Sequence, residues 1–163
     1  MAEPLSPEYR ASVLAVDDEP AVLSSIRRVL RRSMIDVRVA TDGAAALKQL
    51  GPWFPELLLL DVSMPGMSGQ AFLRRFRQVE SRFQRVDGRR LAPVPVMFVS
   101  ARSGHRQRLD GLNAGAVDYL TKPFDPEELR ARVCSHIRHH RRVQDAILAA
   151  DPNRAAAVSG APA

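Results

Sequence analysis

Five polar side chains follow apolar runs in this sequence, and their types suit one kind of chemistry. They are Asp17, Asp18, Asp61, Ser100 and Lys122. Three carboxylates brought together would repel one another, and a hard divalent cation with oxygen ligands, such as Mg²⁺, relieves that repulsion. A lysine adds a positive charge that binds phosphate, and a serine hydroxyl adds a hydrogen-bond donor. If folding gathers these groups, they predict a magnesium site at which an aspartate accepts a phosphoryl group.

The stretch before Asp61 indicates how the groups are held. Leu57–Leu60 is a run of four leucines, which is typical of a strand buried on both faces of a parallel sheet. We expect further strands at residues 12–16, 37–40, 94–99 and 117–120. Open α/β sheets build their sites at the carboxyl ends of the strands. The polar side chains after these runs should therefore meet at one edge of the sheet.

Helix signals alternate with the strands. Pro20 suits the first turn of a helix, and Asp125 with Pro126 suits the start of the last one. The first helix should bury the residues that recur at helical spacing, which are Val22, Ile26, Val29 and Leu30. Other helices are expected at 44–50, 68–79 and 104–113. The alternation predicts an α/β fold, a doubly wound, flavodoxin-like, five-stranded parallel sheet in the order 2-1-3-4-5.

Length and composition indicate one globular domain with additions at its ends. The chain has 163 residues, of which 45% are hydrophobic. We expect a flexible leader at 1–10, the domain at 11–142, and a helix extension with a disordered tail at 143–163. The connection at 80–93 is long for a compact domain, which is typical of a functional or mobile segment.

The same composition argues against several protein classes. The single cysteine, Cys134, excludes an internal disulfide framework and is expected to be inert core. No apolar run is long enough for a membrane helix, and the first residues do not resemble a signal peptide, so we expect a cytoplasmic protein without a membrane partner. The net charge of +6 invites a nucleic-acid partner. However, the arginines are scattered over helices and no reading motif is present, which disfavours it.

Four motifs in order make residues 12 to about 140 resemble the receiver domain of two-component response regulators. The motifs are VDDEP at 16–20, LLLLDVSMPGMSG at 57–69, FVSAR at 98–102 and AGAVDYLTKPF at 114–124. The resemblance implies that Asp61 is the phosphoacceptor and that Ser100 and Lys122 contact the phosphoryl group. It implies Mg²⁺ ligands at Asp17, Asp18, Asp61 and the backbone carbonyl of Ser63. It also implies an aromatic switch at Tyr119 and a cis bond between Lys122 and Pro123.

The resemblance implies a response regulator rather than an enzyme in the ordinary sense, and from the length of the sequence we expect it to act as a stand-alone one. A histidine kinase or a phosphotransfer protein would phosphorylate Asp61, and the change would switch a surface that binds a downstream protein; a homodimer is a further possible partner. The positions that tune the lifetime of the phosphoryl group are Ser63, which is small, and Arg102, which could shield the site. Ser63 would leave room for an attacking water and shorten the lifetime of the phosphoryl group, whereas shielding by Arg102 would lengthen it.

Alternative functions follow from other features. The last helix is rich in arginine and histidine, and the first interpretation is a basic face exposed to solvent. The alternative is a docking surface that makes the chain an adaptor for a separate output enzyme or for nucleic acid. His136 and His140, spaced i,i+4, could share a metal. An aspartate-nucleophile phosphatase is disfavoured, because that family needs a second acid at the position of Ser63.

Overall fold

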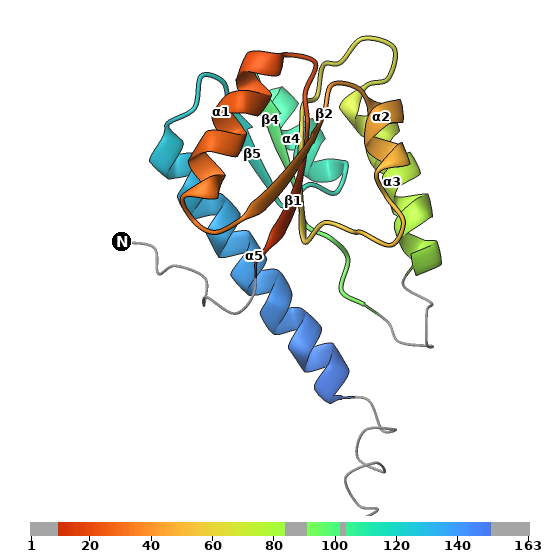
Figure 1. The fold of residues 1–163 in the computed structure, drawn as a ribbon. Helices are drawn as coiled ribbons and strands as arrows, with labels where there is room; N and C mark the ends of the chain where they lie inside the picture. Colours follow the sequence, from red (N-terminus) through yellow and green to blue (C-terminus); the bar gives the residue numbers. More distant parts are fainter. Residues whose placement is uncertain (1–9, 84–90, 102–103, 151–163) are drawn as a thin grey trace, which may run out of the picture.

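The computed structural model describes residues 10–83, 91–101 and 104–150 of the chain. Strands and helices alternate along it (Figure 1). They are β1 (Ser12–Val16), α1 (Pro20–Arg31), β2 (Asp36–Ala40), α2 (Gly43–Lys48), β3 (Leu57–Leu60), α3 (Gly69–Phe83), β4 (Val96–Ser100), α4 (His105–Asn113), β5 (Asp118–Thr121) and α5 (Pro126–Ala149). Residues 1–9 of the expected leader, residues 84–90 of the connection, Arg102 and the tail from residue 151 lie outside the described residues.

The five strands form one parallel sheet in the order β2-β1-β3-β4-β5, which confirms the predicted fold. β1 and β3 are neighbours, with Val16 opposite Leu60, and Leu60 lies opposite Phe98 of β4. The chain order changes direction between β1 and β3. This is the switch point at which such sheets open a crevice.

Two hydrophobic cores cover the two faces of the sheet, and the leucine run serves both. Leu57 and Leu59 pack in the core beneath α1 and α5, whereas Leu58 and Leu60 pack in the core beneath α2 and α3. Figure 1 shows α1 and α5 together on one side of the sheet and α2 and α3 on the other. Strand side chains alternate between faces, so an unbroken apolar run is the pattern that burial on both sides requires.

Two helices differ from expectation in informative ways. α1 buries Leu23, 4% exposed, whereas Val22 is only partly buried against the same core. α3 continues to Phe83, beyond the expected end near Val79. The extra turn is held by packing, because the Phe83 ring lies 5.4 Å from that of Phe54, a contact that helix periodicity does not reveal. In the described part of the chain, no helix combines the length and apolar character needed to cross a membrane.

A buried carboxylate ties the end of α3 to the segment that leads into β4. Glu80 is 5% exposed, and its two oxygens are both engaged. Oε1 accepts a hydrogen bond from the Val94 N–H at 2.5 Å, and Oε2 pairs with Arg77 Nη1 at 2.7 Å. A buried N–H without an acceptor is costly, so this carboxylate contributes to stability on both sides of the long connection.

Glu80→Ala should therefore lower the free energy of unfolding by about 1–3 kcal/mol, because the Val94 N–H loses its acceptor. Urea denaturation followed by circular dichroism measures the change. Gln78→Ala on the exposed side of the same helix is the control and should stay within about 0.5 kcal/mol of the native protein. Equal effects of the two substitutions would show that the Glu80 contacts are not important.

Candidate functional site

Two carboxylates lie side by side at the carboxyl edge of the sheet. Asp17 follows β1 and Asp61 follows β3, and their side chains are nearly inaccessible, at 2% and 4% residue exposure. Backbone hydrogen bonds continue the sheet through both residues, because the Asp17 N–H donates to Ala40 O and the Asp61 N–H donates to Val16 O. The two acids therefore stand on the rigid ends of neighbouring strands.

Lys122 reaches these acids from the end of β5, the strand at one edge of the sheet. It follows β5, where its N–H donates to Ser100 O at 2.8 Å, and Ser100 itself is 1% exposed at the end of β4. The Lys122 Nζ lies 2.6 Å from Asp17 Oδ2 and 3.6 Å from Asp61 Oδ2. The expected cis bond between Lys122 and Pro123 is present. Residues far apart in sequence thus meet at one place.

The loop after Asp61 is fixed by a close backbone approach. The Ser63 N–H donates to Asp61 Oδ1 at 3.2 Å, and the Gly69 N–H donates to Val62 O at 3.0 Å. A Cβ atom at Gly69 would lie 2.5 Å from the carbonyl oxygen of Asp61. Only glycine fits there, so the start of α3 presses against the backbone that carries the acid.

The charges at this edge shift one another's titration. Burial raises the pKa of Asp61, an effect reinforced by the nearby Asp17 and Asp18 and opposed by the Ser63 N–H and by Lys122. Burial alone would lower the pKa of Lys122, but its pairing with Asp17, Asp61 and Glu19 outweighs burial and raises it. Lys122 thus remains charged, and Asp61 is a more basic carboxylate than one in water.

The oxygen ligands that a hard cation prefers are present beside this lysine. Asp17, Asp18 and Glu19 each offer a carboxylate oxygen, and these oxygens lie within 4.8 Å of one another. Asp17 Oδ2 is buried without a hydrogen bond and has only its ion pair with Lys122. An all-oxygen set with one such atom fits Mg²⁺.

One member of this set was not expected from the sequence. Glu19 belongs to the VDDEP motif and pairs with Lys122 at 3.2 Å, but only Asp17 and Asp18 of that motif were expected at the site. Asp18 is exposed, unlike Asp17. The acid directly after the aspartate pair was the signal that could have found Glu19.

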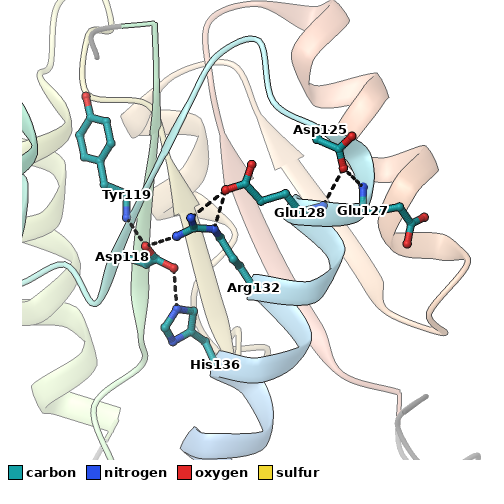
Figure 2. Close-up of polar contacts among 7 residues, drawn as sticks. All are labelled: Asp118, Tyr119, Asp125, Glu127, Glu128, Arg132 and His136. Atoms are coloured by element: carbon teal, nitrogen blue, oxygen red, sulfur yellow. Dashed lines mark hydrogen bonds and ion pairs between the residues drawn. The ribbon is translucent and has the colours of Figure 1, made fainter. Parts of the chain in front are cut away.

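Tyr119 lies on β5 beside the site and is 3% exposed. Its ring packs against α4 at Gly111, where a Cβ atom would lie 3.2 Å from Tyr119 Cδ2 and 3.0 Å from Phe98 Cδ2. Figure 2 shows the ring extending away from α5, whereas the neighbouring Asp118 faces that helix. Because successive strand residues point to opposite faces, β5 connects two distinct environments.

Asp118 joins β5 to α5 through a compact group of polar contacts (Figure 2). Its Oδ1 accepts from Arg132 Nη1 at 2.6 Å and from the Tyr119 N–H at 2.8 Å, and its Oδ2 lies 2.9 Å from His136 Nε2. Burial opposes ionisation of this carboxyl, but the bonds from His136, Tyr119 and Arg132 outweigh it and lower the pKa of Asp118.

These contacts bear on two interpretations of the last helix that the sequence left open. His136 pairs with Asp118 rather than sharing a metal with His140, and no group of three potential ligands within the described ranges includes either histidine. The last helix also presents fewer unpaired positive charges than a fully solvated basic face would, because several of its arginines form ion pairs with acids. The pairs are Arg130 with Glu127, Arg132 with Glu128 and Asp118, and Arg141 with Glu56.

The Gly69 contact predicts a steric effect on the acid. Gly69→Ala should lower the free energy of unfolding by about 1–3 kcal/mol, because the new methyl group must displace the Asp61 backbone. Gly51→Ala is the matched control, since a Cβ atom there meets nothing within 4 Å. Urea denaturation of both variants measures the difference. Indistinguishable stabilities would show that the approach is loose in solution.

The lowered pKa of Asp118 predicts a pH-dependent contribution to stability. A carboxyl with a lower pKa in the folded state contributes stability above its unfolded value of about 3.9, and this is lost as the pH falls through the folded value. The stability difference between native protein and Asp118→Asn should therefore be largest near neutral pH and shrink below about pH 4. Urea denaturation at several pH values tests this. A difference that stays constant down to the lowest pH would contradict it.

Comparison with known proteins gives one consistent result. The family model for the response regulator receiver domain matches residues 13–134. The transcriptional regulatory protein TrcR of Mycobacterium tuberculosis is 37% identical over 126 residues, which cover 77% of this chain and 45% of TrcR. This chain spans about half the length of the curated relatives it matches.

Solved structures agree with the sequence matches. The beryllofluoride-activated receiver domain of DrrB, a Thermotoga maritima protein, is 28% identical with a TM-score of 0.66, covering 80% of this chain and 99% of that one. The chemotaxis response regulator CheY4 of Vibrio cholerae is 26% identical with a TM-score of 0.67, covering 78% of this chain and 99% of that one.

Proposed function

We propose that this chain, which belongs to the response regulator receiver domain family, accepts a phosphoryl group on Asp61 and switches a binding surface in response. The observation that carries the proposal is the position of Lys122, whose Nζ contacts Asp17 and Asp61 at once. Phosphoryl transfer needs mainly positioning and neutralisation of charge on the transferring oxygens. A lysine side chain that is only 10% exposed, beside a buried nucleophilic carboxylate, provides both.

The metal in this proposal is Mg²⁺. The carboxylates of Asp17 and Asp18 would hold it together with Asp61 and the backbone carbonyl of Ser63, and Glu19 is close enough to contribute. When bound, Mg²⁺ supplies positive charge that balances the carboxylates and the phosphoryl oxygens. With the charge of Asp17 balanced in this way, the ammonium group of Lys122 would be available to bind the phosphoryl group.

The transfer step begins with phosphohistidine on a histidine kinase or a phosphotransfer protein. A carboxylate oxygen of Asp61 attacks the phosphorus, an oxygen–phosphorus bond forms, and the nitrogen–phosphorus bond breaks. The electron pair of the broken bond stays on the imidazole nitrogen of the donor. Lys122 and the Ser100 hydroxyl hold the phosphoryl oxygens, which gives an acyl phosphate at the end of β3.

The response in this proposal passes from Ser100 to Tyr119. Ser100 is drawn toward the phosphoryl group, and Tyr119 turns into the space released, which alters the surface of α4, β5 and α5. Gly111 supports this role, because its missing side chain is what lets the Tyr119 and Phe98 rings lie against α4. The altered surface would bind a downstream protein, as in a stand-alone regulator.

A nucleic-acid output is the second candidate. It is favoured by the relative TrcR, which is named a transcriptional regulatory protein, so nucleic acid is no longer disfavoured as a partner. An enzyme of the aspartate phosphatase kind is not favoured. That enzyme class needs a second acid two residues after the nucleophile, and here the position is Ser63. Ser63 contacts Asp61 through its backbone N–H.

Beryllofluoride with Mg²⁺ tests the proposal, because it imitates the phosphoryl group on an aspartate. The amide signals of Tyr119 and its neighbours should shift in the native protein and stay unchanged in Asp61→Asn. Asp145→Asn, an exposed acid near the end of α5, is the charge-matched control and should respond like the native protein. An equally strong response in Asp61→Asn would refute the role of Asp61. Turnover of an external phosphate ester would instead indicate a hydrolase.

A further inference from the structure

A cavity of about 490 Å³ lies at the opposite end of the sheet from the carboxylates. It is bounded by the last turns of α1, the residue before β1 and the start of β2. In Figure 1 this is the lower end of α1, whereas β1 ends at the top of the view. Asp17 follows the end of β1, so the length of that strand separates the cavity from the site described above.

Three arginines line this cavity, and they are Arg10, Arg27 and Arg31. We call it the arginine pocket. Arg27 and Arg31 are four residues apart on α1, so they lie on the same face of the helix and repel each other. Among the lining residues that the structure describes, Asp36 is the one acid. These described residues carry three positive charges and one negative charge, a net charge of +2.

These arginines have no acidic partner in the part of the chain that the structure describes. Among the residues with described placement, none of the three forms an ion pair or a side-chain hydrogen bond, whereas several arginines of α5 do. A cluster of like charges without partners costs stability unless something of opposite charge binds it. Arginine presents a planar fork of donors that matches the oxygens of a phosphate group.

The end of α1 does not oppose an anion as strongly as a free helix end would. The carbonyl oxygens of a helix C-terminus carry partial negative charge. Here Leu30 O accepts from the Ser33 and Ile35 N–H groups, and Arg31 O accepts from the Met34 N–H. The tight turn that makes these bonds places Met34 at φ 60° and leaves its side chain 51% exposed at the cavity rim.

We propose that the arginine pocket is a binding site for a small organic phosphate carrying at least two negative charges, separate from the site at Asp61. The net lining charge of +2 matches such a dianion, and the volume lies in the range of small-molecule sites. Met34 offers an apolar edge for the organic part of the ligand. The concave shape favours one compact ligand over a nucleic-acid strand, which needs an extended basic track.

The test uses the full ¹⁵N-labelled chain in magnesium-free buffer, titrated with pyrophosphate as the probe. Saturable shifts of the Ile35, Asp36 and Val37 amides are expected. Arg27→Gln/Arg31→Gln should weaken binding by at least about tenfold, because two charge-assisted contacts are lost. Asp36→Asn should tighten it. The control is Arg74→Gln/Arg75→Gln, which removes the same charge from exposed positions on α3 and should bind like the native protein.

Several results would overturn the proposal. These are the absence of saturation, equal weakening in both double variants, or shifts confined to the residues around Asp61. Arg10→Gln, which lies outside every helix and strand, repeats the test without altering α1, so a folding defect in the double variant leaves the question decidable. A displacement experiment compares ADP, as a small organic phosphate, with a DNA duplex. If the duplex displaces pyrophosphate at a lower concentration of phosphate groups than ADP does, the pocket is a nucleic-acid contact and the proposal fails.

Discussion

The ion pairs of Lys122 with Asp17 and Asp61 are the constraint on which the rest of the structure depends. Two nearly buried carboxylates on neighbouring strands cannot both remain charged without a compensating cation. The lysine that compensates them follows β5, while the acids follow β1 and β3, with β4 in between. The strand order and the parallel register must therefore both be correct before the charges balance. The Lys122 N–H bond to Ser100 O then fixes where the long side chain begins.

Small backbone features convert this balance into a defined site. The fit of Gly69 against the Asp61 carbonyl sets the distance between the start of α3 and the end of β3. The Ser63 N–H then orients one oxygen of the Asp61 carboxylate, which leaves the other toward Lys122. In the proposed phosphoryl transfer, this rigidity would hold Asp61 in line with the phosphorus atom, since misplacement by about 1 Å slows such reactions.

Polar contacts on α5 join this helix to the strands that carry the site. Arg141 forms two hydrogen bonds with Glu56, directly before β3, and Asp118 binds Arg132 and His136 from β5. The strand that carries Tyr119 is thus held to α5 by one face and to α4 by the other. A shift of Tyr119 would be transmitted to both helices, because the strand backbone connects the two sets of contacts. The paired arginines of α5 also contrast with Arg27 and Arg31 of α1, which form no ion pair within the described residues.

The sequence by itself determined the fold class, the strand order and the position of Asp61 at the end of a doubly buried strand. The fold class and the place of Asp61 follow from local patterns: an unbroken leucine run, alternating periodicities, and caps such as Asp125, whose side chain accepts from N–H groups in the first turn of α5. The strand order was expected because it is the doubly wound order that suits a chain of this size. Only the tertiary structure decided that Leu23 is buried and that His136 and Arg141 pair with Asp118 and Glu56. Such contacts join residues up to 85 positions apart, and they depend on side-chain directions that packing sets. No periodicity along the chain encodes those directions.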